Sequence, residues 1–294
     1  MSLPPPSQNQ AYCDISALEG GHVRVPLQWV LDTAKDGEKM NAPGLSFLLR
    51  HSSNNDTMLV DIGVRKDWEN LPKALVERLT KIGFVVDVPQ DVPTSLRNGG
   101  IDPASIKNVL ITHIHFDHYG DTTSFTVAKF LVGSEGADIA TSANVPANLL
   151  PQGRTAFLSP HTSEPSFGHW SPIGPFAHAL DFYKDGSLYI IDAPGHLPGH
   201  INVLARTSAD GGWVYLAGDT AHDHRLINGE AKVAYTEAFG CAHHDKAGAE
   251  KHIERVRELK EKNDRVRVIL AHDEPWYQRN KGGSAFLPGK LESL

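Results

Sequence analysis

Three histidines and one aspartate lie within six positions of the segment ITHIHFDHYG, residues 111–120: His113, His115, Asp117 and His118. Imidazole and carboxylate groups bind borderline and hard divalent ions, and the absence of thiolates argues against a closed structural zinc site. His113 and His115 are two residues apart at the end of an apolar run, so their side chains point the same way if that run is a strand. The cluster as a whole predicts metal binding.

Three later apolar runs also end in side chains that could bind a metal. LYIIDAPGHLPGH contains His196 and His200, WVYLAGDT ends near Asp219, and VRVILAHDE reaches His272. Buried strands that stop at polar residues place those residues along one sheet edge, where a rigid scaffold holds them. Four such runs predict one metal centre assembled from separated parts of the chain.

Other segments predict the elements that support this centre. LSFLLRH and TMLVDIG, which begin at Leu45 and Thr57, are expected to pair as a hairpin across the turn-rich SSNND. Apolar residues at helical spacing predict one helix over residues 68–79 and another over residues 249–259, the second after the candidate cap Asp245.

Composition limits the class of protein. The 294 residues are 40% hydrophobic and 21% charged, enough for a large core. We expect a single domain over residues 1–294, with residues 1–20 as an N-terminal extension. The net charge of −7 gives no electrostatic footprint for nucleic acid, and no apolar run approaches the ~20 residues that span a bilayer. The missing secretory signal and the scarce cysteines, Cys13 and Cys241, favour a cytoplasmic location.

Residues 146–179 form a long stretch that is rich in proline, glycine and serine and shows little periodicity. A connection of this length is commonly a functional loop, although a surface meander is the alternative. We expect a loop insertion that lines a substrate pocket with its aromatic residues, Phe157, Phe167, Trp170 and Phe176.

The four opening residues match the His-x-His-x-Asp-His signature, and the sequence thereby resembles the metallo-β-lactamase-fold hydrolases over residues 45–274. The resemblance implies an α/β fold, an αββα sandwich with the ligands at strand ends. It also implies two divalent ions. One would bind His113, His115 and His200, the other Asp117, His118 and His272, and Asp219 would bridge both.

Two residues near these ligands keep open roles. The resemblance assigns the second histidine of PGHLPGH to the metal, so His196 is expected to support the site without binding an ion. Asp61 in LVDIG either orients a ligand histidine or forms a turn, and the sequence leaves both roles open.

Two cations ~3.5–4 Å apart can bridge a water and lower its pKa, which gives a hydroxide that attacks a carbonyl. The resemblance is strongest to the quorum-quenching lactonases, which open N-acyl homoserine lactones, and implies a small cyclic ester, amide or carbamate as substrate. The alternatives are a hydrolase whose main substrate is a γ-lactam or a cyclic carbamate, and a thioester hydrolase. An iron-dependent oxidoreductase of this fold is the least favoured alternative.

Zinc is the expected metal, although manganese, iron and cobalt fit similar geometry. The oligomeric state stays open, with a homodimer as one option.

The catalytic candidates are Asp117 and His222. The lactonases often carry a tyrosine three residues after the bridging aspartate, where it polarises the carbonyl, and His222 stands at that position here. An imidazole can donate the same hydrogen bond. His224, a candidate pocket residue, is the rival for this role, and His222 is preferred.

Overall fold

The strands of the computed structural model, which describes residues 2–161, 168–237 and 240–294, form two sheets. The first has the order β4-β1-β2-β3-β5-β6-β7 and the second the order β13-β12-β11-β10-β9-β8. The strands of the first sheet are β1 (Cys13–Pro26), β2 (Lys39–His51), β3 (Thr57–Val60), β4 (Val85–Asp87), β5 (Asn108–Ile111), β6 (Lys129–Gly133) and β7 (Thr155–Leu158). Those of the second are β8 (Trp170–Ile173), β9 (Phe176–Asp181), β10 (Leu188–Asp192), β11 (Ile201–Arg206), β12 (Trp213–Leu216) and β13 (Val266–Ile269).

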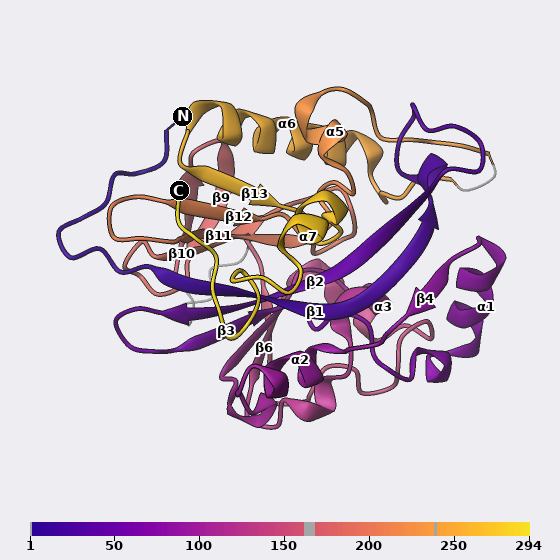
Figure 1. The fold of residues 1–294 in the computed structure, drawn as a ribbon, viewed down its shortest axis with the longest axis horizontal. Coiled ribbons are helices and arrows are strands. Elements are labelled where there is room, and N and C mark those ends of the chain that lie inside the picture. The colour runs from indigo at the N-terminus through magenta and orange to yellow at the C-terminus, as the bar shows by residue number, and fades with distance from the viewer. Residues whose placement is uncertain (1, 162–167, 238–239) are drawn as a thin grey trace.

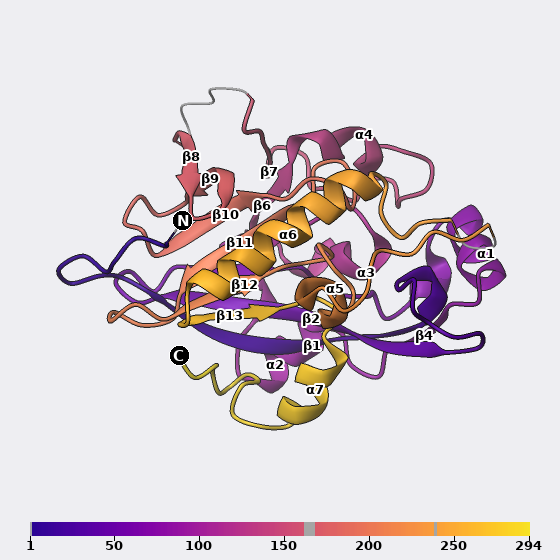
Figure 2. The same cartoon turned by 90° about the horizontal axis from the view of Figure 1, so that it is seen from above.

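Helices cover the outer faces of both sheets. Figure 1 shows α5 and α6 above the second sheet and α2 below the first, and Figure 2 shows α6 lying along β11 to β13. The αββα sandwich is therefore confirmed. The α-helices are α1 (Lys73–Lys81), α2 (Val92–Asn98), α3 (Phe116–Tyr119), α4 (Ala137–Ala140), α5 (His224–Asn228), α6 (Lys246–Lys262) and α7 (Glu274–Asn280). The 3-10 turns are η1 (Leu27–Trp29), η2 (Trp68–Asn70), η3 (Pro103–Ser105), η4 (Thr122–Ser124) and η5 (Ser134–Gly136).

Two apolar clusters hold the layers together. Between the sheets, Met58 of β3 belongs to the same buried cluster as Val203 of β11. Outside the second sheet, Ile253 and Val256 of α6 belong to a cluster that includes Leu204 of β11. Because each strand buries alternate side chains on opposite faces, the second sheet contributes to both clusters.

The expected hairpin and the expected helix after Asp245 are both confirmed. β2 pairs antiparallel with β3, and the Asp245 side chain accepts a hydrogen bond from the Gly248 N–H at the start of α6. The other helix begins later than expected, at Lys73. Pro72 explains the delay, because the residue before a proline is disfavoured in the helical region, and Leu71 is extended at ψ 160°.

Two expected segment boundaries are wrong. Residues 13–20, expected in an N-terminal extension, belong to β1. Residues 146–179, expected as a loop insertion, contain β7, β8 and the start of β9. Pro172 lies within β8, and a proline in a short segment argues against a strand when only the sequence is known. The structure accommodates this proline because β8 is an edge strand of its sheet. Within the described ranges, no helix is long and apolar enough to span a bilayer.

Candidate metal centre

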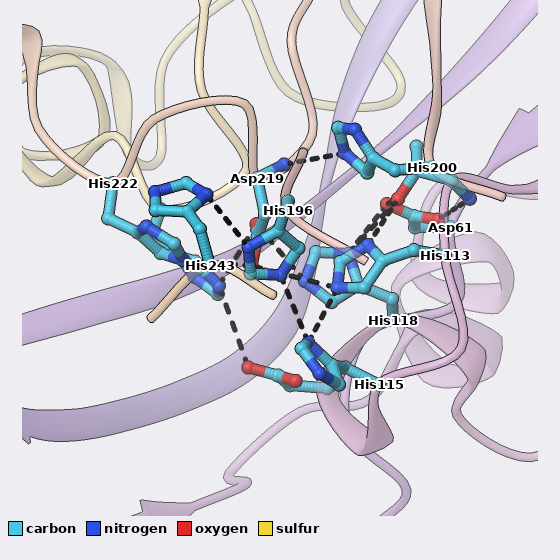
Figure 3. A network of polar contacts seen from close by, with 12 residues as sticks. Asp61, His113, His115, His118, His196, His200, Asp219, His222 and His243 are labelled. Carbon is cyan, nitrogen blue, oxygen red and sulfur yellow. Dashed lines mark hydrogen bonds and ion pairs between the residues drawn. The ribbon is translucent and has the colours of Figure 1, made fainter. Parts of the chain in front are cut away.

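The metal-binding candidates gather where β5, β10, β12 and β13 end. Figure 3 shows His115, His196 and Asp219, from three of these segments, side by side. β12 and β13 pair in parallel, and β10 runs in the same direction because both β10 and β12 are antiparallel to β11. The loops that leave these strands therefore meet at one end of the sandwich. We call the side chains that converge there the metal edge: His113, His115, Asp117, His118, His196, Asp219 and His272.

One group at the metal edge consists of His113, His115, His196 and Asp219, whose donor atoms all lie within 4.8 Å of one another. His115 Nδ1 is 2.8 Å from His113 Nε2 and 3.1 Å from His196 Nε2. Asp219 Oδ2 is 3.7 Å from His113 Nε2 and 3.4 Å from His196 Nε2. Three ring nitrogens and one carboxylate oxygen thus surround a common point.

A second group consists of Asp117, His118 and His272, again within 4.8 Å. The other oxygen of Asp219 faces this group, since Oδ1 lies 3.3 Å from His118 Nε2 and 3.4 Å from His272 Nε2. His272 Nε2 is also 3.5 Å from Asp117 Oδ2. Asp219 therefore turns one oxygen toward each group, which is the arrangement of a bridging ligand.

The polar atoms at the metal edge fit divalent ions better than they fit one another. His118 Nε2 and Asp219 Oδ1 are buried and 3.3 Å apart, yet neither makes a hydrogen bond to any described residue. A buried polar atom that lacks a hydrogen bond costs about 1–3 kcal/mol, and an ion bound to both atoms would remove that cost.

Charge in the first group fits metal binding, which needs ionised carboxylates and neutral imidazoles. Burial alone would raise the pKa of Asp219, but the nearby histidines, His118 foremost, hold it well below its usual range. Burial lowers the pKa of His115 to about 4. It also lowers the pKa of His113 and His196 well below the usual value. In the second group the pKa of His118 and His272 is raised, because the attraction of Asp219 outweighs the effect of burial, so an ion there would displace their protons.

The structure places His196, and not the expected His200, among the side chains that could hold the first ion. His200 Nδ1 donates to the Ala193 carbonyl at 2.9 Å, and the Asp219 N–H donates to His200 Nε2 at 3.2 Å. With both nitrogens held by backbone, His200 belongs to neither group. His196 lies in the turn and faces the ligands, whereas His200 comes immediately before β11. The spacing of the two histidines in PGHLPGH does not reveal this difference.

Asp61 contacts a ligand histidine, which decides between its two open roles. Its Oδ2 accepts hydrogen bonds from His118 Nδ1 and Thr112 Oγ1, both at 2.8 Å, and its Oδ1 accepts from the Thr112 N–H at 2.7 Å. These bonds hold a backbone with a φ of 60°, which aspartate tolerates better than most residues. Asp61 therefore orients His118.

The two candidate carbonyl donors have different surroundings. His222 is buried, and its Nε2 is 3.1 Å from Asp219 Oδ2. His224 starts α5, and its Nε2 is 2.6 Å from Asp273 Oδ2. The structure thus brings His222 to the metal edge and pairs His224 with a carboxylate beside it.

One residue near the ligands, His243, was not predicted from the sequence. Its Nδ1 is 3.3 Å from His196 Nδ1, and it forms a close group with His196 and His222 (Figure 3). The signal that could have revealed it is the pair of histidines in CAHHD, directly before the helix cap Asp245.

A cavity of about 350 Å³ opens onto Asp117, Asp219 and His222. Much of the remaining lining is apolar and comes from β1, η1, β2, α1 and the residue before β4, although α1 also contributes Arg78. We call six of these apolar residues the cavity wall: Val23, Trp29, Met40, Leu75, Leu79 and Phe84.

The expected pocket aromatics lie elsewhere, which corrects their predicted role. Phe157 is 40% exposed and borders a separate depression. Phe176 is buried and stacks on Tyr215 at 5.1 Å between ring centroids. Trp170 packs at the edge of the cluster between the sheets, and Phe167 lies outside the described residues. The apolar lining of the cavity is supplied by earlier parts of the chain, so it does not need residues 146–179.

A family model described as the Metallo-beta-lactamase superfamily matches residues 41–272. Gamma-lactamase FDB1 of Fusarium pseudograminearum is 36% identical over 234 residues, which are 75% of this chain and 56% of that protein. Gamma-lactamase MBL2 of Gibberella moniliformis is 35% identical over 178 residues, 56% of this chain and 70% of that protein. The chain thus spans little more than half the length of the first relative.

Solved structures show the same fold. B. thuringiensis AiiA with N-decanoyl-L-homoserine bound at its active site matches with a TM-score of 0.70 and 17% identity, over 99% of this chain and 100% of that one. At this identity the likeness concerns the fold alone.

Proposed function

The chain belongs to the Metallo-beta-lactamase superfamily, and from that premise we propose that it is a dinuclear metal-dependent hydrolase that opens a cyclic amide or a cyclic ester. The observation that carries the proposal is Asp219, whose two oxygens face two separate ligand groups. A site for one ion would need neither the second group nor a carboxylate between the groups.

His113, His115 and His196 would hold one ion with Asp219 Oδ2, and Asp117, His118 and His272 would hold the other with Asp219 Oδ1. When bound, two such ions would supply Lewis acidity, which lowers the pKa of a water and polarises a carbonyl. Zinc is the first choice for a mixed set of histidine and aspartate ligands without thiolates.

His222 and Asp117 supply the remaining chemistry. His222 lies at the cavity beside Asp219, where its ring can donate a hydrogen bond to the carbonyl oxygen as negative charge develops there. Asp117 also borders the cavity, and its carboxylate takes the proton of the attacking water and gives it to the ring nitrogen or oxygen that leaves. The carbonyl–heteroatom bond breaks, and the product carries both new ends on one molecule.

The apolar residues of the cavity wall favour a substrate with an apolar body, and Arg78, which lines the same cavity, could contact a polar group on it. A γ-lactam is the first candidate for the ring, because two relatives at 36% and 35% identity are named gamma-lactamases. A lactone is the second candidate, because the same carbonyl geometry serves both kinds of ring.

The direct test is hydrolysis of a panel of γ-lactams, lactones, cyclic carbamates and thioesters by protein whose metal content has been measured. We expect about two divalent ions per chain and ring opening of at least one cyclic substrate, with activity lost to a chelator and restored by zinc. A single tightly bound iron and no hydrolysis across the panel would refute the proposal and favour the oxidoreductase alternative.

A further inference from the structure

His243 is a buried histidine at the metal edge that neither the ligand set nor the proposed reaction uses. It lies on the segment between β12 and β13 that leads into α6, far in sequence from the ligand turn that contains His196. Figure 3 shows its ring beside those of His196 and His222. The ring centroids of His196 and His243 are 5.1 Å apart.

Backbone contacts fix His243 next to His196. The His244 N–H donates to the His196 carbonyl at 2.8 Å, and the Asp245 N–H donates to the Gly195 carbonyl at 2.9 Å. Gly195 has a φ of +129° and lies so close to α6 that an added Cβ would be 2.2 Å from the Ala249 nitrogen. The ligand turn and the start of α6 are therefore packed together as one unit.

The two nitrogens of His196 have different surroundings. Nε2 faces the first ligand group, 3.1 Å from His115 Nδ1 and 3.4 Å from Asp219 Oδ2. Nδ1 is on the other side of the ring and lies 3.3 Å from His243 Nδ1. An ion bound at Nε2 leaves the proton of the neutral ring on Nδ1, so Nδ1 needs an acceptor.

Other ligand histidines have such acceptors, and each acceptor is an oxygen. His118 Nδ1 donates to Asp61, and His272 Nδ1 donates to the Pro43 carbonyl at 2.9 Å. For His196 the corresponding contact is to the His243 ring nitrogen.

We propose that His243 is a positioning residue that accepts the Nδ1 proton of His196 and so fixes the ring that binds the first ion. This inference rests on the proposed dinuclear centre, and it concerns one ion of the two. Mutation of a residue that hydrogen-bonds to a ligand histidine typically weakens metal affinity about 10- to 100-fold.

Two variants of similar size separate the acceptor from the volume of the ring. His243→Leu keeps an apolar side chain but has no acceptor, whereas His243→Asn carries an amide oxygen at the position of Nδ1. The control is His244→Leu, which changes the adjacent, exposed histidine. Zinc affinity is measured for all three by titration against a competing chelator, and thermal unfolding tests the fold.

For His243→Leu we expect one of two ions to bind about 10- to 100-fold more weakly while the other is unchanged. His243→Asn should bind both ions nearly as the wild type does, and so should His244→Leu. Wild-type affinity in His243→Leu, or an equal loss in His243→Asn, would overturn the proposal. A third ion that the wild type binds and His243→Leu does not would instead make His243 a ligand.

These affinities do not depend on the choice of substrate. If two ions bind and no panel compound is hydrolysed, the proposed function fails while the role of His243 stands. If the panel is hydrolysed and His243→Leu keeps both affinities, only this inference fails.

Discussion

The metal edge and the cavity wall both contribute to the lining of one cavity, and they differ in how the sequence encodes them. The metal edge uses side chains whose chemistry is rare, each within a few residues of the end of a buried strand or, for Asp117 and His118, in the short helix α3 that follows β5. The cavity wall uses valine, leucine, methionine and aromatic residues that would suit any core. Residue type therefore identifies the candidate ligands, whereas only the folded chain shows which apolar residue faces a substrate.

The bridging aspartate gives the strongest test of the metal edge. Asp219→Ala removes one oxygen from each ligand group, so both ions should be lost or weakened and hydrolysis should fall to background. Metal analysis and activity of the same sample check this, with Asp138→Ala as a control at an exposed position in α4. Two tightly bound ions in Asp219→Ala would refute the bridging role.

His196 and His200 test the corrected ligand assignment within one turn. His196→Ala should lose the first ion, because its Nε2 faces that group. His200→Ala should keep both ions but lose stability, because the Asp219 N–H and the Ala193 carbonyl lose their partner. A buried group left unpaired costs about 1–3 kcal/mol. Metal content and the free energy of unfolding, measured for both variants, separate the two roles, and a reversed result would restore His200 as the ligand.

The sequence predicted the fold and most of the metal edge because both depend on local patterns. Apolar runs define the strands, and a polar residue directly after each run marks the shared edge, as with Asp219 after β12. His196 and His200 were exchanged because both lie in one glycine-rich turn, and the direction of each ring depends on backbone contacts such as His200 to Ala193.

The cavity wall could not be predicted in this way. Trp29 and Leu79 are separated by fifty positions and come together only through the sheet and the placement of α1. His243 was missed for a similar reason, since its partner His196 is in another loop. The aromatic residues of 146–179 were a plausible choice by composition, but Phe176 is used in the core.

His222 lies where the metal edge meets the cavity, so its variant tests how the two regions cooperate. His222→Ala should keep both ions and lose about 10²–10³ in kcat, the usual effect of removing one donor to a developing oxyanion. His224→Ala is the control, because its ring is paired with Asp273. The measurements are metal content and kcat. A fully active His222→Ala enzyme would exclude the carbonyl-donor role of His222. A large loss of kcat in His224→Ala alone would assign that role to His224.

The smallest effects should come from the cavity wall, which Trp29 tests, with Phe157 outside the cavity as the matched aromatic control. Trp29 borders the cavity, and its ring is 5.3 Å from that of Phe84 and 6.3 Å from that of His222. Trp29→Ala should raise KM about tenfold or more, because a substrate loses apolar contacts worth about 1–3 kcal/mol, while kcat changes less.

Phe157 is exposed on β7 at the far edge of the first sheet. Phe157→Ala should leave both constants unchanged and alter stability by no more than about 0.5 kcal/mol. Steady-state kinetics on the substrate found in the panel decide which of the two regions contacts the substrate. A raised KM in Phe157→Ala with none in Trp29→Ala would return residues 146–179 to the substrate pocket.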